Sequence, residues 1–125
     1  MMEMVTELVA DALRQARFVR KYLDAKIIPL LDPRHRTFAT NISRRLVQRD
    51  ILNEALLIDL DAFLAVIGEA IENGTTLTWR GHEHDPNCGY TMPVRSDAAN
   101  ALLYFQGEIV DLVTAIEGAL DAAKA

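Results

Sequence analysis

The chain has 125 residues, a length typical of one domain built around a single hydrophobic core. Half of its residues are hydrophobic and a quarter are charged, which is ordinary globular composition and excludes a largely disordered chain. The net charge of −5 argues against nucleic acid as the main partner, and a single cysteine, Cys88, excludes an internal disulfide.

The first residues lack the features of a secretory signal. Glu3, Glu7 and Asp11 stand where a positively charged start and a long apolar run would be needed. The most apolar stretch, residues 55–71, contains three carboxylates and is interpreted as a core helix rather than a membrane span. We therefore expect a cytoplasmic protein of one domain, residues 1–125, without membrane contact.

Charge is divided unevenly along the chain. Residues 1–50 contain 10 Lys and Arg against 6 Asp and Glu, whereas residues 51–125 contain 3 against 12. Two interpretations remain open: the halves attract each other across a bundle or a dimer, or the basic half offers a face to an anionic partner.

A first helix is predicted from about Glu3 to Ile28. Pro29 and Pro33 bracket its end, and residues 32–36 are interpreted as a turn. Apolar side chains recur at helical spacing along this helix and form one stripe: Val5, Leu8, Val9, Ala12, Ala16, Val19, Leu23 and Ile27.

A second helix is predicted to begin near residues 37–41, with Thr40 or Asn41 as its cap. Asp50 could cap a third helix. The sequence equally allows one long helix to run through residues 37–72.

The segment from about Ile51 to Glu72 is apolar around nearly its whole circumference. A helix of this kind must be covered on both sides, so we expect it to be either the central helix or in contact with another subunit. Gly74 is predicted to end it as a left-handed cap. One face carries large side chains, and the back carries smaller ones, namely Ala55, Ile58, Ala62, Ala65 and Val66.

Residues 75–94 break the helical pattern. The beginning of this segment is rich in strand formers and its middle in turn formers, so a short β-hairpin or an ordered loop is predicted. Because an isolated hairpin is marginally stable, Leu77, Trp79 and Met92 are expected to pack on the bundle. Ser96 is predicted to cap a last helix that runs to about residue 123. Its predicted apolar face consists of Leu102, Phe105, Ile109, Leu112, Val113, Ile116 and Leu120.

Zinc-capable side chains cluster in this same segment. A tetrahedral zinc site needs four ligands, of which His82, His84 and Cys88 would supply three, with Asp85 or a residue elsewhere as the fourth. The spacing lacks the paired Cys-x-x-Cys or His-x-x-x-His pattern of specific zinc motifs. The alternative interpretation is a polar turn with solvated side chains.

Glu69 with Glu72, and Glu108 with Asp111, form two acidic pairs on predicted helices. Residues three apart share a helix face, so each pair could direct two carboxylates towards one Mg²⁺ ion. Two such pairs on neighbouring helices resemble the arrangement in all-α MazG-like nucleotide pyrophosphohydrolases. The resemblance covers these four residues and implies Mg²⁺-dependent attack of water on a nucleotide triphosphate. The alternative interpretation is two solvated helix faces.

Two basic helical faces are candidates for anion binding. If they lay side by side, they could follow a phosphate backbone, although neither carries the aromatic platforms that bind single strands. A solvated, salt-bridged surface is the alternative interpretation. The candidate residues are Arg14, Arg17 and Lys21 on the first helix, and Arg45 and Arg49 on the second, with Arg44 beside them.

These patterns predict an all-α fold, a small bundle of about four helices with a short β-hairpin or ordered loop between the last two. The leading functional hypothesis is a non-enzymatic protein–protein interaction module of the adaptor, inhibitor or immunity type, which forms a homodimer and needs no cofactor. The alternatives are the Mg²⁺-dependent enzyme and a zinc-stabilised or nucleic-acid-binding domain. The expected interaction surface consists of Ala55, Ile58, Ala62, Val66, Trp79 and Tyr90.

Overall fold

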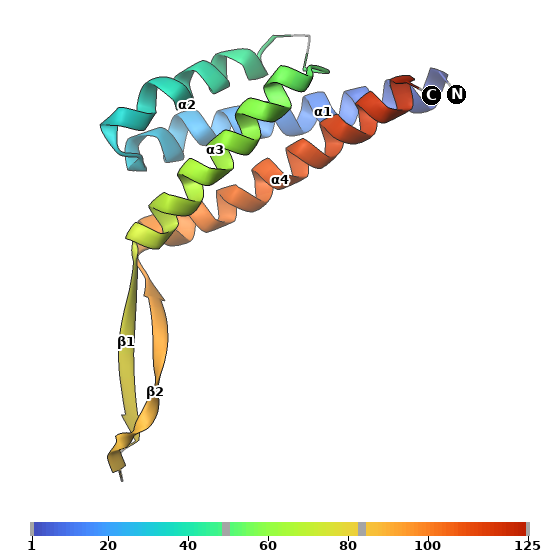
Figure 1. Ribbon diagram of the computed structural model, residues 1–125. Helices are drawn as coiled ribbons and strands as arrows, with labels where there is room; N and C mark the ends of the chain where they lie inside the picture. The colour runs from blue at the N-terminus through green and yellow to red at the C-terminus, as the bar shows by residue number, and fades with distance from the viewer. Residues whose placement is uncertain (1, 49–50, 83–84, 125) are drawn as a thin grey trace.

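The fold is mostly helical, with one β-hairpin (Figure 1). A computed structural model describes residues 2–48, 51–82 and 85–124. Within these residues, a π-helical stretch (Leu23–Ile27) and a 3-10 turn (Ile28–Leu30) extend the first helix. The main elements are α1 (Met2–Tyr22), α2 (Pro33–Leu46), α3 (Glu54–Asn73), β1 (Thr75–His82), β2 (Asp85–Arg95) and α4 (Asp97–Lys124).

The four helices pack into one body around a shared core. Helix α4 packs against both α1 and α3, while α2 contacts α1 and α3. The predicted apolar stripes are confirmed, because their middle positions are the buried ones. The largest fully buried side chains are Phe63, Phe105, Leu23, Ile27, Leu31, Ile42, Ile51, Leu56, Leu60, Ile67, Ile109 and Leu112.

The start of α2 differs from the prediction. Residues 32–36 form not a turn but the first turn of α2: the Asp32 carboxylate accepts a hydrogen bond from the Arg34 N–H at 3.1 Å, and Pro33 is the first helical residue. Asp as cap followed by Pro is a strong helix start, since Pro lacks the N–H that would be unsatisfied there. Thr40 is therefore not a cap but lies inside the helix, where its hydroxyl donates to the Arg36 carbonyl at 2.8 Å.

Residues 37–72 contain two helices rather than one. Helix α2 ends at Leu46, and α3 begins at Glu54, where the Asn53 side chain caps the helix by accepting from the Ala55 N–H at 2.8 Å. The alternative cap, Asp50, lies outside the described residues.

Gly74 ends α3, but not in the predicted left-handed conformation. Its φ is −94° and its ψ is 10°, which other residues also adopt. The reason for glycine is space, because a Cβ atom at this position would lie 2.9 Å from both the Ala99 Cβ and the Ser96 Oγ. Ser96 caps α4 as predicted, accepting from the Ala99 N–H at 3.1 Å.

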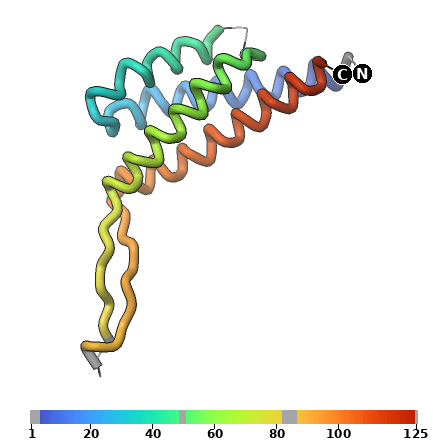
Figure 2. Tube along the Cα trace, viewed as in Figure 1, coloured from blue at the N-terminus to red at the C-terminus, as the bar shows by residue number. Residues whose placement is uncertain are grey.

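The predicted hairpin is confirmed, but its expected packing on the bundle is wrong. Strands β1 and β2 pair antiparallel and project from the end of the helical body where α3 meets α4 (Figures 1 and 2). The exposed fractions are 71% for Leu77, 55% for Trp79 and 42% for Met92. The strands continue outward from the ends of two adjacent helices, so the helices do not lie beneath them.

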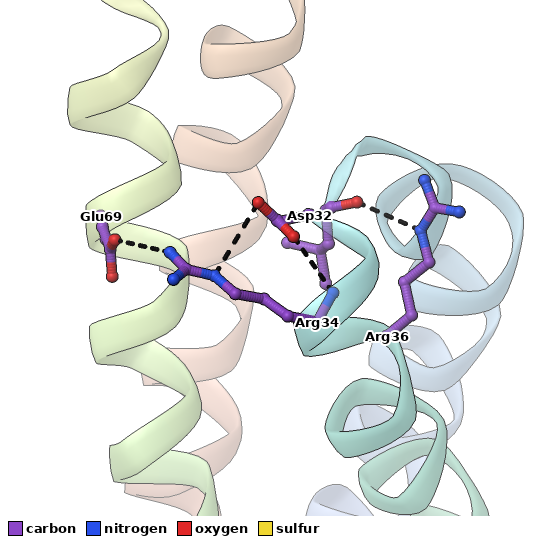
Figure 3. Close-up of polar contacts among 5 residues, drawn as sticks. Asp32, Arg34, Arg36 and Glu69 are labelled. Carbon is purple, nitrogen blue, oxygen red and sulfur yellow. Dashed lines mark hydrogen bonds and ion pairs between the residues drawn. The ribbon is translucent and has the colours of Figure 1, made fainter.

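Ion pairs link the basic and acidic halves of the chain. Arg34 of α2 binds Glu69 of α3 at 3.1 Å (Figure 3), and Arg45 of α2 binds Asp59 of α3. The Arg34 pair is largely exposed and contributes little to stability. These contacts support the interpretation that the two halves attract each other within the bundle.

Lys124, at the end of α4, binds Glu54 at the start of α3 at 2.8 Å. Lys124 lowers the pKa of Glu54, and Glu54 raises the pKa of Lys124. Since the unfolded chain then binds more protons than the folded chain near pH 4.5, this pair adds stability that is lost as the pH falls through the lowered pKa of Glu54. It is lost again as the pH rises through the raised pKa of Lys124.

Glu54→Gln is accordingly expected to lower the thermal midpoint slightly at neutral pH and to leave it unchanged at both pH extremes. Melting curves followed by circular dichroism from pH 3 to 11 measure this difference. Glu117→Gln, which alters an exposed carboxylate of α4, is the control. A pH-independent difference for Glu54→Gln would contradict the assignment.

Candidate interaction surface

The hairpin presents apolar side chains on both of its faces. The strand register pairs Leu77 with Pro93 and Trp79 with Thr91. Since side chains alternate between the faces of a strand, Leu77, Trp79 and Pro93 share one face. The opposite face carries Tyr90, Met92 and Val94, which are 57%, 42% and 43% exposed.

The back of α3 forms a second exposed apolar patch. Ile58 is 69% exposed, Ala55 and Ala62 are exposed, and Val66 is half-buried beside the core. The described residues therefore do not cover α3 on both sides, so α3 is not the central helix of the bundle. The expectation that a partner covers the patch stays a prediction.

Three exposed apolar residues of α4 were not identified from the sequence. Leu103, Tyr104 and Val110 of α4 are 40%, 54% and 47% exposed. In the sequence they are direct neighbours of predicted core positions such as Phe105. The helical period therefore did not distinguish them from the buried face. Glu108, one turn away, raises the pKa of Tyr104.

A shallow hollow of about 280 Å³ lies where α1 passes into the π-helical stretch. Its lining is almost entirely apolar, although two of the residues that form it are lysines. The Tyr22 ring stacks on the Phe105 ring, with the centroids 5.7 Å apart. The lining residues are Phe18, Lys21, Tyr22, Ala25 and Lys26.

The structure does not bring the two acidic pairs together into one group of carboxylates. Glu69 binds Arg34 of α2, whereas Glu108 accepts a hydrogen bond from the Gln15 amide of α1 at 2.8 Å. The two carboxylates are thus directed to different neighbouring helices. Across residues 2–48, 51–82 and 85–124, no group of three or more His, Cys, Asp or Glu side chains could hold a metal ion.

The proposed zinc ligands are only partly described. Cys88 is exposed on β2. The residue His84 and the side chain of His82 lie outside the described part of the structure.

The candidate anion-binding residues are divided between different roles. Arg14 binds Asp11 at 3.0 Å, and Arg45 binds Asp59. Arg17 and Lys21 are exposed on α1, and Arg49 lies outside the described residues. The described members therefore do not leave two matching basic faces free.

Comparison with models of protein families, with curated proteins and with solved structures found no match to this chain. Among the described helices, none has the length and apolar character needed to cross a membrane.

Proposed function

We propose that the protein is a non-enzymatic protein–protein interaction module that self-associates and binds through its hairpin. The observation that carries the proposal is the pair of uncovered apolar faces on the hairpin, with Leu77 71% and Trp79 55% exposed. A two-stranded hairpin is at best marginally stable in water, and exposed apolar patches mark sites of association. Contact with the hairpin of a partner would cover part of these apolar side chains and stabilise the hairpin.

The described residues of the hairpin lie outside the helical core. The core cluster and the side chains packed against it come from the helices and their connections, and the described hairpin residues are not among them. Apolar residues in the hairpin therefore have no stabilising role in the helical body of the chain. This supports a role in association.

Charge favours the hairpin over α3 as the element of self-association. Helices α3 and α4 contain ten Asp and Glu side chains and one lysine, Lys124. Two copies that met through the back of α3 would bring these acidic helices together, and like charges repel. The α3 patch of Ala55, Ile58, Ala62 and Val66 is better suited to a partner with a cationic rim.

The double variant Leu77→Thr/Trp79→Thr is expected to convert a dimer into a monomer, because it removes apolar surface while keeping strand-forming residues. Light scattering coupled to size-exclusion chromatography measures the molar mass. The thermal midpoint of the helices should change little. Val47→Thr is the matched control, since Val47 is 53% exposed at the end of α2.

The wild-type chain supplies a second measurement, because Trp79 is its only tryptophan. Its fluorescence emission should shift to shorter wavelength as the protein concentration rises and the partner covers part of the indole. A wild-type chain that stays monomeric with unshifted emission at millimolar concentration would refute self-association.

A further inference from the structure

The backbone hydrogen bonds of the hairpin determine which groups its outer edges expose. Beyond the Thr75–Arg95 pair, the Ser96 N–H donates to the Gly74 carbonyl at 2.9 Å. Hydrogen-bonded and non-hydrogen-bonded pairs alternate in an antiparallel ladder. Because the register is regular up to Gly81, the odd-numbered residues of β1 direct their N–H and C=O groups outward.

The two outer edges differ in what they offer another strand. Pro93 pairs with Leu77, so its nitrogen lies on the outer edge of β2. Proline has no N–H, and its presence on an edge strand interrupts pairing there. Strand β1 contains no proline, and the described sheet has only the strands β1 and β2. The edge of β1 is therefore the open one.

We infer that β1 pairs antiparallel with β1 of a second copy, which forms a four-stranded sheet from two hairpins. The inference rests on the self-association proposed above and specifies how it occurs. With a two-fold axis at Thr78, β1 pairs along its whole length. Leu77 of one copy then lies opposite Trp79 of the other. Their outward backbone groups then hydrogen-bond to each other, and the aliphatic and aromatic side chains make cross-strand contacts.

Two properties of the hairpin favour a second copy of the chain as its partner, namely its small number of strands and its lack of net charge. Three or more strands with an apolar face are stable where two are marginal. The hairpin segment 75–95 is electrically neutral, with two Arg and two acidic residues, and in this register Arg80 lies opposite Thr76 rather than its own copy. The eight residues of β1 span about 26 Å. The acidic bodies are thus held apart by more than the screening length of about 8 Å at physiological ionic strength.

Disulfide trapping tests the register. Cys88→Ser removes the native thiol, and Thr78→Cys then places one thiol at the proposed axis, where Cα atoms of the two copies would lie about 4.5 Å apart. That separation permits a disulfide. Thr76→Cys in the same background is the matched control, because its two Cα atoms would be about 13 Å apart. Oxidation should link the Thr78→Cys chains on the order of 100-fold faster.

Proline substitution tests the edge. Leu77→Pro removes an outward N–H from β1 and should abolish the dimer, with Leu77→Ala measuring the loss of the side chain alone. Thr91→Pro removes an outward N–H from β2 and should leave the dimer intact. Equal crosslinking at positions 76 and 78, or a dimer that survives Leu77→Pro, overturns edge pairing. If edge pairing is overturned but the wild-type protein is still dimeric, the proposed self-association stands. A wild-type protein that is monomeric under all conditions refutes both the edge pairing and the self-association.

Discussion

Phe105→Ala is expected to lower the free energy of unfolding by about 3–5 kcal/mol, the cost of removing a buried phenylalanine ring. Phe105 is fully buried in α4, and its ring stacks on Tyr22 of the neighbouring helix α1. The substitution removes apolar burial and leaves a cavity that packed helices cannot close. Urea titration followed by circular dichroism at the helical band measures the loss.

Leu103→Ala is the matched control for this substitution. Leu103 lies two residues away on the same helix but is 40% exposed. Its replacement should change the free energy of unfolding by less than about 0.5 kcal/mol, as for most surface positions. Similar losses for both variants would mean that the inner face of α4 has been wrongly identified. Since natural domains are stable by only about 5–15 kcal/mol, Phe105→Ala should remove a large fraction of the stability of the protein.

Sequence periodicity was sufficient to predict the helices and their inner faces. The spacing of Leu102, Phe105 and Ile109 predicts the buried side of α4, and the structure confirms it. Burial of one stripe per helix is determined locally, because the 3.6-residue period must match a core whatever the topology. The hairpin between α3 and α4 was also predictable, from turn formers flanked by strand formers.

The start of α2 was harder to predict from the sequence than the buried helix faces. Asp followed by Pro is typical both of turns and of helix starts, since a short acidic acceptor and a fixed φ suit either. The Asp32–Pro33 pair therefore has two local interpretations. The structure selects helix, because residues 39, 42 and 46 then face the core.

The direction of the hairpin depends on tertiary contacts that the sequence does not display. Whether Trp79 packs on helices or projects away is decided where β1 leaves α3. There the Ser96 N–H binds the Gly74 carbonyl, and Ala99 packs closely against Gly74. The sequence therefore indicated which hairpin residues are apolar, such as Trp79 and Tyr90, but not that they project away from the helices. The open edge of β1 follows only once the register assigns Pro93 an outward nitrogen.

Gly74→Ala is expected to destabilise the protein by about 1–3 kcal/mol, the usual penalty for inserting a methyl group into a packed site. The backbone conformation at Gly74 is open to alanine, so the penalty comes from the 2.9 Å approach to the Ala99 Cβ and the Ser96 Oγ. Gly118→Ala is the control, because a Cβ on Gly118 meets nothing within 4 Å. It should stabilise α4 by about 0.5–1 kcal/mol.

A double-mutant cycle with Ala99→Gly isolates the steric cause, since the second substitution removes one of the two clashing atoms. Gly74→Ala should cost clearly less in the Ala99→Gly background than in the wild type. An equal cost in both backgrounds, measured by urea titration, would show that the Ala99 Cβ is not the source of the penalty.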